Sequence, residues 1–531
     1  MKNILSLTGV RVSLMALVLL CTASCTDNFG DYNKRGDQPT AEEMTRPVLL
    51  NSMIQQMQNY VIPVQENAYQ MSENLIGHIY GRYFATTNGG WSTTFSFFNA
   101  GDGWINSPYN DVFPKTYEAW GKVKELTEAE GVYYSWAQIL RIAAMHRMTD
   151  MYGPIPYSKL SEGTGGIAAA YDSQDIVYKQ MIDDLDAAID EITLYVAANP
   201  SDRSMYKADL VYGGDFSKWL KFARSLKFRI LMRMVYADEA YAKAGIRELM
   251  DNESLLMDSN GDNANITVNR NPLNVMWDSY SDCRVAADIV TYMEGYSDPR
   301  MSAYFAHGEA TFSNGKYNGL RVGILLDKNW SLKYSTPNEP ESKKTVLWMP
   351  ASEIAFLKAE AKLRWSDLPG GTAEDYYREA VRLSFEQHAA SGYDTYIEND
   401  TKTQAAYVDP NLTPNNSTAA LSTITIKWES TDTDEQNLER IITQKWIALY
   451  PLGTEAWSEH RRTGYPRFFS VPRVQNTDAS LATRLASRIP FPPDERLNNT
   501  ANYNGAVSLL GGADNYSTRL WWDKKVGKPN W

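Results

Sequence analysis

Aromatic side chains are concentrated in three stretches of this sequence that lack helical or strand periodicity. The first stretch holds six of them within nineteen residues, from Trp91 to Tyr109, with Asn, Asp, Ser and Gly interspersed. A flat aromatic ring beside amide and carboxylate groups suits a sugar, because a sugar ring has an apolar face and a rim of hydroxyl groups. The candidate ligand-binding residues are Trp91, Phe95, Trp104, Tyr109, Trp277, Tyr280 and Trp330.

The alternative for these aromatics is that they fill a core beneath long loops, since Trp and Tyr are largely buried on average. For any single ring the core is the better expectation. The first stretch as a whole is hard to bury entirely, and exposed aromatic patches usually mark binding sites. We therefore expect Trp91 and Trp104 to belong to the ligand site, with Trp277 and Trp330 as secondary candidates.

Motifs for catalysis and metal binding are sparse. The five histidines form no His-Glu-x-x-His motif, and the sequence contains no Gly-x-Ser-x-Gly, phosphate-binding loop or Cys-x-x-Cys. Residues 258–262 have the first three alternating oxygens of a calcium loop, but Asn263 replaces its Gly and Asn269 its Glu. We predict a turn there, and no catalytic residue, metal or cofactor. Carboxylates are numerous, so a glycosidase pair stays open as an alternative.

The N-terminus has the order of an export signal. Two basic residues precede the short apolar run 12–20, and small residues precede Cys25. The run is too short to span a bilayer, which needs about 20 apolar residues. The arrangement resembles a bacterial lipoprotein signal, in which Cys25 is lipidated and becomes the first residue of the mature chain. Plain secretion, with cleavage near Ala23, is the alternative.

Length and charge describe an exported, folded body. The chain has 531 residues and a formal charge of −12, which becomes −14 when a leader with two basic and no acidic residues is removed. An acidic body argues against nucleic acid as a partner. After removal of the leader and lipidation of Cys25, Cys283 is the single remaining cysteine, so we expect no intramolecular disulfide and a buried thiol. We divide the chain into a signal (1–24), a lipid-anchored tether (25–45) and one compact body (46–531).

Helical spacing dominates the body, which places it in the mainly α class. Good helix formers fill 353–365, and Gly370-Gly371-Thr372 then separates this helix from a second one over 376–388. Ala in the packing positions of this αα-hairpin indicates close helix pairs of the TPR type, although no strict 34-residue repeat occurs. Long irregular stretches that carry the aromatics are expected over 83–112, 255–285, 305–348, 392–432 and 463–531.

Six motifs occur in one order along the chain. They are Asp150–Tyr157 (D-x-Y-G-x-x-P-Y), Tyr212–Arg229 (GGD…W…SLK-x-R), Asp298–Arg300 (DPR), Phe356–Ala361 (FLKAEA), Gln444–Pro466 (QKW…EAW…RRTGYP) and Arg488–Pro492 (R-x-P-x-P). Together they resemble the motifs of the RagB/SusD family, with Arg224 where the family usually has Asn.

The resemblance implies a SusD-like fold of divergent TPR-like helix pairs with long ligand-binding loops. It also implies a surface lipoprotein of the outer membrane of Bacteroidetes, not an enzyme, that passes oligosaccharides to a SusC-like TonB-dependent transporter. We interpret the motif residues as structural. We expect Arg147 and Arg229 to meet buried carboxylates or carbonyls, and Arg461 and Arg462 to clamp loops. Two alternatives remain: capture of peptides instead of glycans, and a secreted helical glycosidase.

Overall fold

The computed structural model describes residues 45–161, 169–411 and 416–529. By its internal contacts the chain divides into residues 1–50 and residues 51–531, and we describe the second unit. Cys25, the signal and the tether lie outside the described residues. Within the described part of the chain, no helix combines the length and the apolar character that a membrane span requires.

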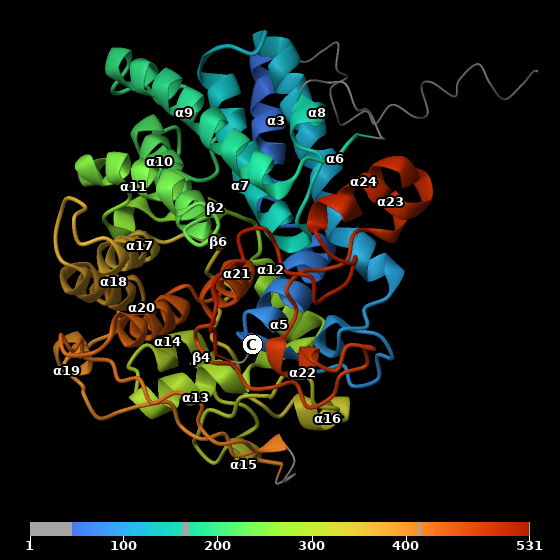
Figure 1. Ribbon diagram of the computed structural model, residues 1–531, viewed down its shortest axis with the longest axis vertical. Coiled ribbons are helices and arrows are strands. Elements are labelled where there is room, and N and C mark those ends of the chain that lie inside the picture. Colours follow the sequence, from blue (N-terminus) through green and yellow to red (C-terminus); the bar gives the residue numbers. More distant parts are fainter. Residues whose placement is uncertain (1–44, 162–168, 412–415, 530–531) are drawn as a thin grey trace, which may run out of the picture. The chain divides into compact units, whose positions relative to one another are not determined.

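The body is mainly helical, as the sequence predicts. Its longer helices are α3 (Arg46–Val61), α6 (Asp102–Thr127), α7 (Gly131–Tyr152), α9 (Gln174–Ala198), α10 (Phe216–Arg233), α11 (Glu239–Asp251), α13 (Ala287–Tyr296), α17 (Ala351–Arg364), α18 (Ala373–Gln387), α20 (Asp434–Ala448), α21 (Gly453–Thr463) and α24 (Thr500–Leu510). Several helices that follow one another in sequence pack together, such as α6 with α7, α10 with α11 and α17 with α18. Figure 1 shows α7, α9 and α10 beside one another, and α17, α18 and α20 as a second group.

The predicted αα-hairpin is confirmed as α17 and α18, which begin two and three residues earlier than predicted and each end one residue earlier. Thr372 caps α18, because its hydroxyl accepts from the backbone N–H of Asp375 while the Asp375 carboxylate accepts from that of Thr372. Asp215 caps α10, and its carboxylate accepts from the N–H of Ser217.

The stretch 83–112 is less irregular than predicted. Helix α6 begins at Asp102, so Trp104 and Tyr109 are helical residues and not loop residues. The prediction was wrong because Pro108 and Pro114 lie inside α6, and proline ordinarily ends or kinks a helix.

Short elements occupy parts of all five predicted irregular stretches. They are the helices and turns η2 (Phe95–Phe97), η3 (Glu253–Leu255), η4 (Asn260–Asp262), α12 (Pro272–Asn274), η5 (Val275–Ser279), α15 (Ala310–Ser313), α16 (Lys328–Ser331), α19 (Tyr393–Ile397), α22 (Leu481–Arg484) and α23 (Pro493–Asn498). Elsewhere the chain adds α4 (Glu66–Tyr69), η1 (Gln70–Gly77), α5 (His78–Tyr80), α8 (Ser158–Ser161) and α14 (Met301–Tyr304).

Three small antiparallel sheets tie distant segments together. Strand β1 (Phe84–Thr86) pairs with β3 (Cys283–Val285), with Thr86 opposite Cys283. Strand β2 (Ala264–Thr267) pairs with β6 (Thr345–Met349), and β4 (Phe305–Ala306) with β5 (Thr336–Pro337). Cys283 is buried in β3, and burial raises the pKa of its thiol to about 12, as expected for a buried, unreactive cysteine.

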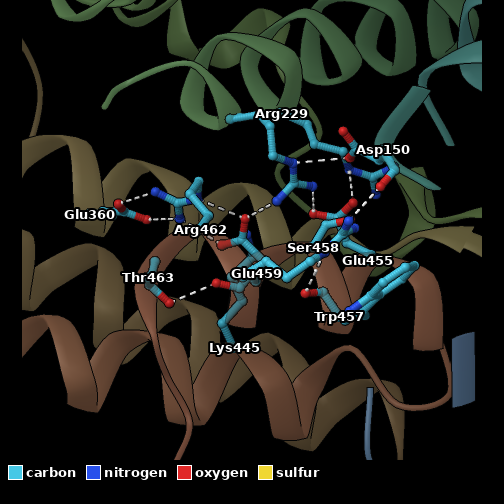
Figure 2. Close-up of polar contacts among 12 residues, drawn as sticks. Asp150, Arg229, Glu360, Lys445, Glu455, Trp457, Ser458, Glu459, Arg462 and Thr463 are labelled. Carbon is cyan, nitrogen blue, oxygen red and sulfur yellow. Dashed lines mark hydrogen bonds and ion pairs between the residues drawn. The ribbon is translucent and has the colours of Figure 1, made fainter. Parts of the chain in front are cut away.

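A buried network of ion pairs joins the helices of the core (Figure 2). The Arg233 guanidinium on α10 meets Asp150 of α7 at 3.2 Å, and also pairs with Glu455 and Glu459 of α21. On the other side of Glu459, Arg462 bridges to Glu360 of α17. Because each charge has a partner at hydrogen-bond distance, the network fixes how the helices of both groups meet.

The predicted scaffold roles are confirmed for three of the four arginines. Arg147 pairs with the buried Glu73, and Arg229 with Glu353 at 2.6 Å. Arg461 donates to the carbonyl of Ser487 at 2.9 Å, which holds a C-terminal loop, and to that of Asp150 on α7. Arg462 was predicted to clamp a loop, but its two carboxylate partners both lie on helices.

The turn predicted at residues 258–262 is confirmed. Ser259 and Asp262 form a capping box around η4. The Lys221 ammonium group lies 3.0 Å from the carboxylates of Asp258 and of Asp262 and offsets part of their negative charge. A cation is therefore already supplied by the chain at this turn.

Candidate functional site

Three segments far apart in sequence converge beside the β1–β3 pair. The loop after β1 continues this pairing, since the N–H of Thr87 donates to the carbonyl of Asp282 at 3.0 Å. Gly89 then packs against the segment 325–331: a Cβ atom built on Gly89 would lie only 2.0 Å from the carbonyl oxygen of Leu326. The loops that carry Trp91, Trp277 and Trp330 therefore contact one another through their backbones.

Five of the predicted residues reach the surface of these segments. Trp91, Trp104 and Trp277 are half-buried, whereas Tyr280 is 36% and Trp330 44% exposed. The Trp91 and Trp104 rings meet edge to face with their centroids 5.0 Å apart. We call these five residues the aromatic surface. An open group of large rings that the core does not absorb is typical of a binding site.

Two predicted ligand residues lie in the core and not at the surface. Phe95 is fully buried, with its ring against Tyr80 and beneath Trp104. Tyr109 stacks on Phe113 at 4.2 Å, and its hydroxyl contacts Tyr171 at 3.2 Å. Phe95 follows the general tendency of aromatics to pack in the core, and Tyr109 packs along α6, so neither belongs to the aromatic surface.

Asp282 lies beneath the aromatic surface and fastens its segments together. The side chain is 4% exposed. Its carboxylate accepts from the Nδ2 of Asn88 at 2.5 Å and from the Nε2 of Gln70. Burial raises the pKa of Asp282 above its usual value, and the charge of Lys328 together with the two amide donors partly offsets this. The sequence gives no sign of this residue, because its partners lie about two hundred positions away.

Polar groups surround the rings. The Tyr280 hydroxyl donates to Oδ1 of Asn67 at 3.2 Å, and the Trp277 indole donates to Oδ1 of Asn274 at 3.1 Å. The Lys333 ammonium lies 4.6 Å from the centre of the Trp330 ring. Aromatic rings can stack on the apolar face of a sugar, while neighbouring polar groups bind the hydroxyl groups at the edge of the sugar. This combination is the chemistry of sugar recognition.

The carboxylates of the buried network are arranged for structure. Burial alone would raise the pKa of Glu360 and Glu455, but the neighbouring arginines overcome this and hold both at about 2. Both carboxylates are buried and already ion-paired. A glycosidase acid needs the opposite, a raised pKa and access to the substrate.

A large cavity has none of the residues of the aromatic surface in its wall. It has a volume of about 960 Å³ and runs along α6, with Phe113, Tyr117 and Trp120 in its wall. Tyr109 belongs to this wall and so is separated from the other predicted ligand residues. The cavity borders Leu160 and Ala169, between which residues 162–168 lie outside the described part of the chain, and we place no site there.

Comparison with known proteins gives one consistent family. The family model of SusD and RagB outer-membrane lipoproteins matches residues 31–523. A SusD homologue from Bacteroides uniformis is 38% identical, covers 90% of this chain and 99% of that chain, and superposes with a TM-score of 0.84. A SusD homologue from Bacteroides thetaiotaomicron is 37% identical with the same coverage and a TM-score of 0.83.

A third solved structure is described by its ligand. It is a chitin-binding SusD homologue from Flavobacterium johnsoniae, 35% identical to this chain. The match covers 91% of this chain and all of that chain, with a TM-score of 0.84. A search among curated proteins finds no match to this sequence.

Proposed function

This chain belongs to the SusD-like family of outer-membrane lipoproteins, and from that premise we propose that it captures oligosaccharides on the aromatic surface and does not cleave them. The observation that carries the proposal is the exposure of the large rings of Tyr280 and Trp330 beside the half-buried tryptophans. The chitin-binding relative supports a glycan as the ligand class.

The open form of the surface favours an extended ligand. The rings come from the loop after β1, the start of α6, the segment 277–280 and α16, so they are spread over several elements. Several successive sugar units can then each contact part of the surface. The ligand is recognised mainly through ring faces and hydrogen bonds. Charged groups also lie beside the rings: Lys333 is 4.6 Å from the centre of the Trp330 ring, and the Lys328 ammonium contacts the carbonyl of Tyr280 at 3.5 Å.

Delivery completes the proposed role. We propose that Cys25 carries the lipid that anchors the protein in the outer membrane, exposed at the cell surface. The bound glycan then passes to a SusC-like TonB-dependent transporter. The family description as an outer-membrane lipoprotein supports the anchor. Replacing Cys25 by Ala should release the protein into soluble fractions, and wild-type protein that takes up no labelled fatty acid would rule out the anchor.

Titration calorimetry with panels of oligosaccharides and of peptides tests the binding role. We expect at least one oligosaccharide, with chitin oligomers as the first to test, to bind and to be recovered intact after incubation. Binding of peptides alone would instead favour a peptide-capturing member of the family, and released sugar products would indicate a glycosidase.

A further inference from the structure

A second cavity, separate from the aromatic surface, lies where five parts of the chain meet. It has a volume of about 420 Å³. Tyr69, Glu73 and Tyr450 are buried residues in its wall, whereas Lys343 and Glu386 have side chains that are 46% and 51% exposed. We call this cavity the polar pocket. Its volume is at the lower end of the range of about 300–1,000 Å³ that small-molecule sites occupy.

The charges of the polar pocket are balanced by the chain itself. Its three carboxylates each have a basic partner: Glu73 pairs with Arg147, Glu339 with Lys343, and Glu386 with Arg382. An ion entering the pocket would have to break one of these pairs or stay uncompensated, which is costly in a partly buried site. The pocket is therefore suited to a neutral molecule.

Hydrogen-bonding capacity remains in the wall. Among the described residues, the Tyr69 hydroxyl has one hydrogen-bond contact, with Nε2 of His78 at a long 3.5 Å. The amide of Asn265 has one as well, a 3.4 Å donation to the carbonyl of Asn263. His388 also lines the pocket, and its buried Nε2 has no partner within the described part of the chain. Buried polar atoms are normally paired, so groups of this kind in a cavity wall indicate a polar ligand.

Apolar side chains complete the wall. Ile62, Val346 and Leu452 are buried and line the same cavity as the polar groups. A compact ligand with hydroxyl groups and a C–H face would satisfy both kinds of surface, whereas a purely apolar ligand would leave the polar groups unpaired.

We propose that the polar pocket binds one neutral, polyhydroxylated molecule of about the size of a monosaccharide, independently of the aromatic surface. The two sites are neighbours: Asn67 and Gln70 face the aromatic surface through Tyr280 and Asp282, while Tyr69 faces the pocket. Because different side chains of this short segment serve each site, variants can separate the two.

The probes are four neutral sugars, glucose, galactose, mannose and N-acetylglucosamine, together with glucosamine as a cation and glucuronate as an anion. Each is titrated into the full-length mature protein and into Tyr69→Phe, Asn265→Leu and Trp91→Ala. We expect at least one neutral sugar to bind, and both pocket variants to weaken it by about threefold to tenfold, the effect of losing one hydrogen bond. Trp91→Ala should bind that sugar as the wild type does.

Three results would overturn the proposal. They are no binding of any neutral sugar to the wild type, stronger binding of either charged analogue, and loss of binding in Trp91→Ala with full binding in both pocket variants. The last result would assign the sugar to the aromatic surface. Two pocket variants on different elements, α4 and β2, guard against a folding defect in one of them.

Discussion

Asp282 shows how one buried side chain can control an exposed site. It makes no contact with the exterior, yet its carboxylate holds amides from two other segments. An Asn side chain has the same shape as Asp, but its amide N–H group would face the N–H group of one of these two amides, and that hydrogen bond would be lost. Because the loop of Trp91 would then lose one of its fastenings, we expect the affinity for a glycan to fall about tenfold, or about 1.4 kcal/mol.

Calorimetry on Asp282→Asn checks this prediction, with the exposed Asp394→Asn on α19 as a control that should bind as the wild type does. The circular dichroism spectrum should be unchanged, because the residue lies between loops and not inside a helix. Wild-type affinity in Asp282→Asn would show that the loop is held without it.

The loop after β1 gives a prediction at the scale of the element. Gly89 has no room for a side chain, whereas a Cβ atom on its neighbour Gly90 would meet nothing within 4 Å. Gly89→Ala must push the loop away from the segment 325–331. Overpacking of this kind typically lowers the free energy of unfolding by about 1–3 kcal/mol. We expect a lower unfolding midpoint and weakened glycan binding for Gly89→Ala, and neither for Gly90→Ala. Equal behaviour of the two variants would contradict the close packing of these loops.

The elements differ in how far the sequence predicts them. The α17–α18 hairpin is local: helix formers, a Gly-Gly break and a Thr–Asp capping box all lie within about forty residues, and all are visible in the sequence. Helix α6 was not predicted because its two prolines ordinarily indicate the end of a helix. Tertiary packing overrides this local preference.

The residues of the candidate site also differ in how far the sequence predicts them. Residue type and clustering were enough to single out Trp91 and Trp330, because large rings among polar residues are visible in the sequence. Which rings are buried depends on neighbours from other segments, as with Phe95 against Tyr80 and the Tyr109 hydroxyl against that of Tyr171. The role of Asp282 depends on the β1–β3 pairing, which no local pattern specifies.

At the scale of the whole molecule, the buried network should dominate the response to mutation. Arg462→Met would leave Glu360 and Glu459 buried with one cation fewer, which typically costs about 3–5 kcal/mol. The matched control is Arg382→Met on α18, which breaks only exposed pairs with Glu379 and Glu386 and should cost about 1 kcal/mol or less. Denaturant unfolding of both variants measures the difference. Similar losses of unfolding free energy in the two variants would show that the buried network adds no more stability than surface ion pairs do.

Glycan binding on the aromatic surface is the central claim, and affinity measurements on three alanine variants test it most directly. Trp91→Ala and Trp330→Ala each remove a ring of the surface, while Tyr206→Ala removes an aromatic that is 57% exposed elsewhere. For the oligosaccharide bound best by the wild type, we expect each tryptophan variant to lose about 2 kcal/mol or roughly thirtyfold in affinity, with an unchanged unfolding midpoint, and Tyr206→Ala to bind normally. Normal binding by both tryptophan variants would contradict the account.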